Sequence, residues 1–199
     1  MPTVQEWEQR YESGTTPWDT GRPDEHLLRV VGEHPIAPCR ALEVGCGTGT
    51  NAIWLAEQGF EVLASDVAAR ALTQARRKLN GTHRTVTLHH GSFPVADAPF
   101  DFAFDRGCMH SFDDPAERAS FAEQMAQQLS ADGLWLSIIG STDGAPRDHG
   151  PPRRSARDVV QAVEQHFEIL SLQRGEMDAD LPTTPLMWVS LMKKRRAYR

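Results

Sequence analysis

Short apolar runs alternate along the chain with longer stretches in which apolar residues recur at helical spacing. The runs are rich in Val, Ile and Leu and stop at glycine or polar residues, which is typical of buried strands. They predict five strands in the first 140 residues, at 40–45, 60–65, 85–90, 100–104 and 134–140.

The stretches between these strands carry signals for the starts and ends of helices. Gly59 and Asn80-Gly81 stand where two helices should stop, Pro115 opens a third at its first turn, and Ser155 can cap a fourth. The residues Asp132-Gly133 are predicted to turn the chain into the fifth strand. The four predicted helices cover residues 50–58, 68–79, 115–129 and 156–167.

The last part of the chain predicts an antiparallel hairpin. Residues 141–154 are rich in Gly, Pro and charge and indicate a surface loop, and two further strands follow the last helix at 168–173 and 186–192. The expected fold is a doubly wound α/β fold with a mostly parallel seven-stranded sheet, helices on both faces and an antiparallel C-terminal hairpin. In such sheets a ligand binds at the carboxyl ends of the strands. Those ends are Gly45, Asp66, Ser92 and Asp105.

Composition narrows the classes of function. A chain of 199 residues, 40% hydrophobic, suits one domain with one core. The net charge of −6, without a long basic stretch before the last seven residues, predicts no nucleic-acid partner. No apolar run approaches the roughly 20 residues of a membrane span, and no signal peptide is evident, so we expect a cytoplasmic protein without a membrane partner. The three cysteines form no CxxC pair, so we expect reduced thiols and no metal site.

The strongest motif is the glycine-rich stretch EVGCGTG at 43–49, between the first strand and a helix. Gly45 and Gly47 allow a tight turn and the close approach of a ligand. Asp66 follows at the tip of the second strand, where a carboxylate can accept both hydroxyls of a ribose. A dinucleotide site would need a third glycine at Thr50, so the GxGxG spacing favours a nucleoside that carries an amino acid. A purely structural strand–helix turn remains an alternative.

The stretch 41–66 resembles motif I and the following acidic strand of class I S-adenosylmethionine (SAM)-dependent methyltransferases, above all those of the tellurite-resistance type. The resemblance covers roughly residues 40–140. It implies SAM as the cofactor and a Rossmann-like core, followed by a C-terminal helix and closing strands over 141–199. Glu43 would orient the loop or meet the cationic amino-acid end of SAM through water. The cofactor contacts that it implies here are Glu43, Gly45, Cys46, Gly47, Asp66 and Val67.

The N-terminal segment WEQRYESGTTPWDTGRP, at 7–23, resembles the N-terminus of the thiopurine and thiol/halide methyltransferases. The resemblance implies a lid over residues 1–25, with Trp7, Tyr11 and Trp18 covering the cofactor and Asp19 near the substrate. A sulfonium cation is attracted to the face of an aromatic ring. The alternative is that the aromatic residues only staple an N-terminal helix to the core.

Two further stretches follow strands at the expected crevice. The DRG turn at 105–107 matches the same family, which places Asp105 and Arg106 at the cofactor. After the third strand, Ser92 and Phe93 stand where many class I enzymes carry an acid, so they are expected to hold adenine by backbone contacts and stacking. His110 is the leading candidate for a general base, and Asp19 is the second.

The expected activity is methyl transfer to a small soft nucleophile, such as a thiol, a halide or a tellurium or selenium oxyanion. O-methylation of a small phenolic metabolite is the first alternative. A nicotinamide-dependent oxidoreductase and a non-catalytic SAM-binding protein are further alternatives. A monomer and a homodimer are both compatible with the sequence.

Overall fold

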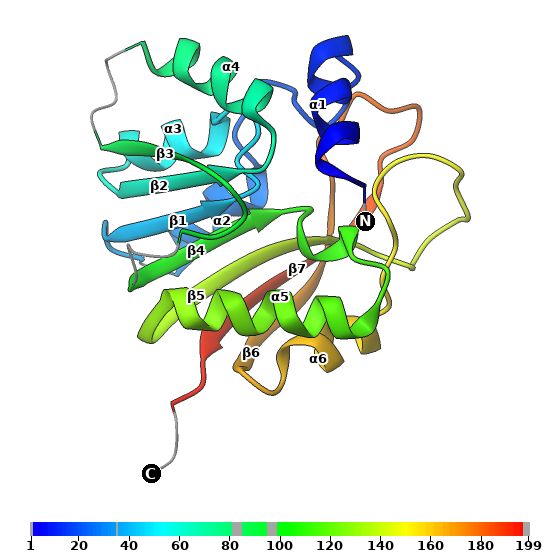
Figure 1. The fold of residues 1–199 in the computed structure, drawn as a ribbon. Helices are drawn as coiled ribbons and strands as arrows, with labels where there is room; N and C mark the ends of the chain where they lie inside the picture. The colour runs from blue at the N-terminus through cyan, green and yellow to red at the C-terminus, as the bar shows by residue number, and fades with distance from the viewer. Residues whose placement is uncertain (1, 35, 81–84, 95–98, 197–199) are drawn as a thin grey trace.

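The computed structural model describes residues 2–34, 36–80, 85–94 and 99–196. Its centre is a seven-stranded sheet in the order β3-β2-β1-β4-β5-β7-β6 (Figure 1). The strands are β1 Arg40–Val44, β2 Glu61–Asp66, β3 Val86–His90, β4 Phe100–Arg106, β5 Leu129–Gly140, β6 Phe167–Glu176 and β7 Leu186–Lys194. The helices are α1 Val4–Ser13, α2 Glu25–Glu33, α3 Thr50–Glu57, α4 Ala69–Leu79, the short 3-10 helix η1 Met109–Ser111, α5 Pro115–Gln128 and α6 Ala156–Val163.

The direction of the strands confirms the predicted fold class. Strands β1 to β5 pair in parallel, whereas β7 is antiparallel to both β5 and β6. The strand order reverses between β1 and β4, and such a switch point opens a crevice at the carboxyl ends of the strands. The fold therefore places the ends of β1, β2 and β4 around one potential ligand site.

Alternate residues of the central strands face two separate cores. Leu136 and Ile138 of β5 pack in the core that includes residues of α2 and α3. Trp135 and Ile139 of the same strand pack in the other core, with residues of α5 and α6. The sheet is thus covered by helices on both faces (Figure 1). Within the described ranges, none of the helices has both the length and the apolar character needed to cross a membrane.

The N-terminal helix stands over the edge of the sheet at which the parallel strands end. Thr3 and Glu6 form a capping box at the start of α1, and Gly14 ends the helix in the left-handed conformation. In Figure 1, α1 lies beside the long loops that follow β5 and β6. Residues of all three segments line the crevice at this edge of the sheet.

The structure differs from the predicted elements at several places, and three of them are informative. Helix α2, N-capped by Asp24, was not predicted, and α6 ends at Val163, short of the expected residue 167. The predicted turn at Asp132-Gly133 is wrong, because both residues lie inside β5, where the register with β4 shifts. A Cβ at Gly133 would lie 3.1 Å from a backbone oxygen of β4, so the glycine permits a bulge here. Asn80 caps α4 as predicted, while Gly81 lies outside the described residues.

Candidate active site

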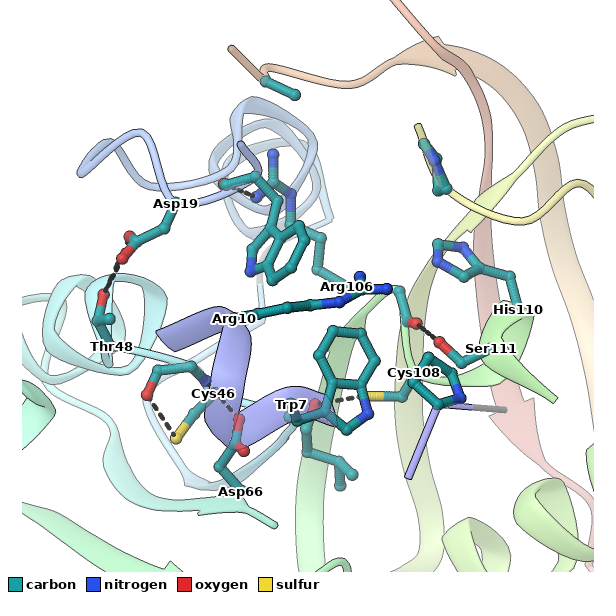
Figure 2. A pocket seen from close by; sticks show the side chains of 18 of the residues that line it. Trp7, Arg10, Asp19, Cys46, Thr48, Asp66, Arg106, Cys108, His110 and Ser111 are labelled. Atoms are coloured by element: carbon teal, nitrogen blue, oxygen red, sulfur yellow. Dashed lines mark hydrogen bonds between the residues drawn. The ribbon is translucent and has the colours of Figure 1, made fainter. Parts of the chain in front are cut away.

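A cavity of about 570 Å³ lies at the carboxyl ends of β1, β2 and β4, within the usual size range of small-molecule sites. Figure 2 shows the side chains that enter it from the glycine loop, the N-terminal segment and the turn after β4. Twelve of the predicted site residues line this cavity: Trp7, Tyr11, Trp18, Asp19, Gly45, Cys46, Gly47, Asp66, Val67, Ser92, Arg106 and His110. Three others, Glu43, Phe93 and Asp105, lie behind its wall.

The glycine loop packs so closely that side chains are excluded from it. Gly45 and Gly47 have φ angles of +69° and +54°, which L side chains rarely adopt. A Cβ at Gly45 would lie 2.3 Å from the sulfur of Cys108, and a Cβ at Gly47 would lie 2.9 Å from the hydroxyl of Tyr11. The loop is therefore in direct contact with both the lid and the turn after β4.

Asp66 connects the tip of β2 to this loop. Its Oδ2 accepts a hydrogen bond of 2.8 Å from the backbone amide of Gly47, and its Oδ1 accepts one of 2.8 Å from Ala68. Burial raises the pKa of this carboxyl above its ordinary value, while the backbone amides of Ala68, Gly47 and Val67 oppose the shift. Since each carboxylate oxygen can accept two hydrogen bonds, one acceptor position remains on each. These positions suit the two hydroxyls of a ribose.

Glu43 supports the loop from below. The side-chain amide of Asn51 donates a hydrogen bond of 3.2 Å to Glu43 Oε1, and the backbone amide of Asp24 donates to the Asn51 oxygen. Complete burial raises the pKa of Glu43 to about 8, so the carboxyl is largely neutral at pH 7. This arrangement supports the loop-orienting role that was expected of Glu43.

Asp19 is fastened to the end of the glycine loop. The hydroxyl of Thr48 lies 2.9 Å from both carboxylate oxygens of Asp19, and the ammonium of Lys78 lies 3.8 Å from one of them. The carboxylate lines the cavity, but its position is defined by these two partners. Asp19 thereby ties the segment after α1 to the glycine loop and to α4.

The aromatic residues of the N-terminal segment form one cluster over the cavity. The Trp18 ring meets Trp7 and Tyr11 edge to face, with centroid distances of 5.7 and 6.4 Å. Tyr11 is buried, and burial together with the nearby Asp66 raises the pKa of its hydroxyl. The cluster both lines the cavity and packs against Ala68 and Ala71, so the stapling of α1 to the core is seen, while the role as a cofactor lid stays a prediction.

Arg106 links three segments at the end of β4. Its guanidinium donates to the backbone carbonyls of Trp18 and Asp178, and its Nε lies 2.8 Å from a carboxylate oxygen of Asp24. Both charged groups of this ion pair are largely buried. The geometry therefore makes Arg106 a wall residue that holds the lid segment in place.

Asp105 and Phe93 have supporting positions in place of the expected direct contacts with the cofactor. Asp105 is fully buried and accepts hydrogen bonds of 3.0 Å from the Cys108 amide and 2.9 Å from the Trp135 indole. Burial raises the pKa of Asp105 to about 6. Phe93 packs against Phe121 with a centroid distance of 5.2 Å. Both residues shape the cavity from behind.

His110 lies in η1 at the far side of the cavity from Asp66 (Figure 2). The backbone amide of Gly140 donates a hydrogen bond of 2.8 Å to His110 Nδ1, so the ring proton belongs on Nε2. Burial and then the charge of Arg154 lower the pKa of His110 to about 3. At neutral pH its Nε2–H is thus a hydrogen-bond donor.

Sequence reasoning missed two residues that shape this site. The Cys108 thiol donates a hydrogen bond of 3.2 Å to the backbone carbonyl of Val44, beside the glycine loop. Arg10, one residue before Tyr11, places its guanidinium in the cavity. A signal for Arg10 was present, since it occurs within the aromatic segment and lies three residues after Trp7 on a helix.

The sequence of this chain is similar to those of known methyltransferases. The family profile of "Thiopurine S-methyltransferase (TPMT)" matches residues 2–195. A probable thiol methyltransferase 2 of Arabidopsis thaliana is 29% identical over 86% of this chain and 77% of its own length. Thiocyanate methyltransferase 1 of Brassica oleracea is also 29% identical, over 81% of this chain and 73% of its own length.

A solved structure shares the fold. It is that of the 1,6-didemethyltoxoflavin-N1-methyltransferase of Burkholderia thailandensis, which contains bound S-adenosylhomocysteine. The TM-score is 0.75 at 19% sequence identity, and the match covers 96% of this chain and 87% of the other. The chain therefore belongs to the thiopurine S-methyltransferase family, and it is a class I methyltransferase that uses SAM.

Proposed function

We propose that this enzyme transfers a methyl group to a small soft nucleophile, such as a thiol or a thiocyanate-like anion. The observation that carries the proposal is a single cavity with two chemically different ends. One end holds the glycine loop and Asp66, and the other holds His110 beside the apolar side chains of Phe112 and Phe121. The names of the two plant relatives, a thiol and a thiocyanate methyltransferase, support the same class of acceptor.

The first end fits the cofactor of the family. Asp66 keeps two acceptor positions for ribose hydroxyls, and Gly47 lines the cavity with its backbone alone. Val67 and Ser92 line the adjoining wall, where adenine would lie. Bound SAM supplies a methyl group on a positively charged sulfur. Trp7 and Trp18 line the cavity beside this charge, and a ring face that the guanidinium of Arg10 leaves free would attract it.

The second end favours an acceptor that needs no general base. His110 presents a donor at neutral pH, and the Asp19 carboxylate is held by Thr48 and Lys78. Methylation of a phenol would profit from a positioned base, whereas a thiolate or an inorganic anion attacks as it is. The chain's task is then to align the acceptor in a dry pocket, which can contribute roughly 7–11 kcal/mol. O-methylation of a phenol is therefore the less favoured of the two proposed reactions.

Membership of the family sets the nicotinamide-dependent alternative aside. The single-domain organisation, the cytoplasmic location, the lack of a nucleic-acid partner and the monomeric or homodimeric state stay predictions from the sequence.

A screen of acceptors tests the proposal. Purified enzyme and SAM are incubated with a small thiol, thiocyanate, iodide or a phenol, and formation of S-adenosylhomocysteine is followed. We expect turnover with the thiol or the anions and little with the phenol. Turnover of the phenol alone would support O-methylation, and tight SAM binding without turnover of any acceptor would support the non-catalytic alternative.

A further inference from the structure

The guanidinium of Arg10 enters the cavity and, among the residues that the structure describes, forms no ion pair within 4 Å. It comes from the last turn of α1, and its central carbon lies 4.9 Å from the ring centre of Trp7 and 5.8 Å from that of Trp18. Figure 2 shows the Arg10 side chain extending across the cavity toward the side that holds His110 and Ser111. Arg10 is thus held in place by two indole rings, and its N–H groups face the space between the two ends of the cavity.

The other arginines at this cavity differ from Arg10. Arg22 pairs with Asp178 at 2.6 Å, and Arg106 pairs with Asp24 at 2.8 Å. Within the described ranges, no carboxylate lies within 4 Å of the Arg10 guanidinium, and no hydrogen bond from it is formed. Hydrogen bonding to Thr3 and then the charge of Arg10 lower the pKa of Glu6, one turn earlier on α1, but Arg10 and Glu6 form no ion pair. A guanidinium has five donors and needs acceptors when it is partly withdrawn from water. The free donors of Arg10 therefore indicate a ligand with negative charge.

A second donor lies on the same side of the cavity. His110 Nε2 carries the ring proton, because Nδ1 accepts from the amide of Gly140. The carboxylates that also line the cavity have partners away from Arg10, since Asp66 accepts from backbone amides and would accept from the ribose, and Asp19 accepts from Thr48. The part of the cavity between Arg10 and His110 thus presents donors and positive charge.

We propose that Arg10, together with the Nε2–H of His110, binds the methyl acceptor as an anion and selects it against neutral acceptors. This inference rests on the proposed function and narrows its substrate to a thiolate or a small inorganic anion. A lone pair of the anion forms the new bond to the methyl carbon, and the pair of the broken carbon–sulfur bond stays on the sulfur of the donor. An anion and a cation give two neutral products, so no proton has to move.

The test compares Arg10→Met with the wild type. We expect kcat/KM for thiocyanate to fall at least about tenfold in Arg10→Met, equivalent to about 1.4 kcal/mol, mainly through a higher KM. Arg10→Lys should recover part of the loss because it keeps the charge. Arg77→Met removes an exposed arginine of α4 outside the cavity and serves as the matched control with unchanged kinetics.

Two additional readouts separate this inference from the proposed function. The Kd of SAM, measured by calorimetry, should change less than about threefold in Arg10→Met. Binding of ¹³C-thiocyanate to protein saturated with S-adenosylhomocysteine is followed by line broadening, which should weaken in Arg10→Met and persist in Arg77→Met. This readout needs no turnover, so it tests Arg10 even if the proposed reaction fails.

Three results would overturn the inference. The first is unchanged thiocyanate kinetics and line broadening in Arg10→Met. The second is an equal loss for thiocyanate and for a neutral acceptor such as dimethyl sulfide, which would assign Arg10 to the architecture of the lid. The third is a wild-type enzyme that methylates neutral acceptors but neither thiocyanate nor iodide.

Discussion

The backbone amide of Gly140, at the end of β5, donates a hydrogen bond of 2.8 Å to Nδ1 of His110 in η1. This contact fixes the tautomer of a histidine that lines the acceptor end of the cavity. It converts the most obvious candidate for a general base into a hydrogen-bond donor. The hydrogen bond between Gly140 and His110 therefore supports an acceptor that needs no general base.

We expect His110 to stay neutral, with its proton on Nε2, from pH 8 down to about pH 4. Its pKa is lowered to about 3, below the ordinary 6.5, so the stability that the neutral ring contributes is complete above pH 6.5 and is lost as the pH falls toward 3. ¹⁵N imidazole shifts measure the tautomer directly. A ring that titrates near pH 6.5 would contradict this assignment and reinstate His110 as a base.

Asp66→Asn should weaken the binding of S-adenosylhomocysteine at least about tenfold, or about 1.4 kcal/mol. The amide replaces one acceptor oxygen with a donor, so it loses both a ribose contact and the hydrogen bond from either Gly47 or Ala68. Calorimetry gives the affinity, and thermal unfolding shows whether the loop itself has been lost. Asp101→Asn, on the exposed start of β4, is the control that should bind normally. Equal affinity in the two variants would remove Asp66 from the site.

Gly45→Ala should destabilise the fold for two separable reasons. A Cβ would lie 2.3 Å from the sulfur of Cys108, and the φ angle of +69° costs an L residue roughly 1–2 kcal/mol. In the double variant with Cys108→Ala, the stability lost through the steric clash should return, while the loss due to the backbone conformation should remain. Denaturant unfolding of both single variants and the double variant measures this coupling. If the losses of unfolding free energy in the two single variants simply add up in the double variant, the Cβ at position 45 does not clash with the Cys108 sulfur.

Trp18→Ala should lower kcat/KM by at least about tenfold while the Tm falls by only about 4 °C. The indole contacts Trp7 and Tyr11 and is only partly buried, so most of its packing belongs to the lid. Steady-state kinetics with the best acceptor and thermal unfolding are compared for the same preparation. A large loss of Tm with unchanged kcat/KM would return Trp18 to a purely structural role.

Glu43→Gln should flatten the dependence of stability on pH between 4.5 and 8. The pKa of Glu43 is raised to about 8 in the fold, so the native state holds a proton that the unfolded state releases, and the wild type loses stability as the pH rises through this range. The neutral Gln keeps an acceptor for Asn51 and does not titrate. The measurement is the free energy of unfolding from denaturant titrations at pH 5 and pH 8. A parallel pH dependence in both proteins would mean that Glu43 is charged in the fold.

Most of the framework could be predicted from the sequence because it depends on local patterns. The glycine loop and Asp66 stand at strand ends that the apolar runs already mark, and parallel strands bring such ends together. The prediction at Asp132-Gly133 was wrong because this dipeptide is compatible with both a turn and a β-bulge. Only the pairing of β5 with β4 decides which of the two forms.

The chemistry at the acceptor end could not be predicted, because it depends on contacts between distant segments. His110 is 30 residues from the amide that sets its tautomer. Arg10 reaches the cavity only because α1 lies over the strand ends, where Trp7 and Trp18 pack against the guanidinium. No pattern along the chain predicts that Arg10 forms no ion pair with the part of the chain that the structure describes.

A crystal structure with both S-adenosylhomocysteine and thiocyanate tests the central claim most directly. We expect the ribose hydroxyls on the carboxylate of Asp66, and thiocyanate between the guanidinium of Arg10 and Nε2 of His110, aimed at the sulfur of the cofactor product. An adenosyl group bound away from Asp66, or thiocyanate bound only outside the cavity, would contradict the account.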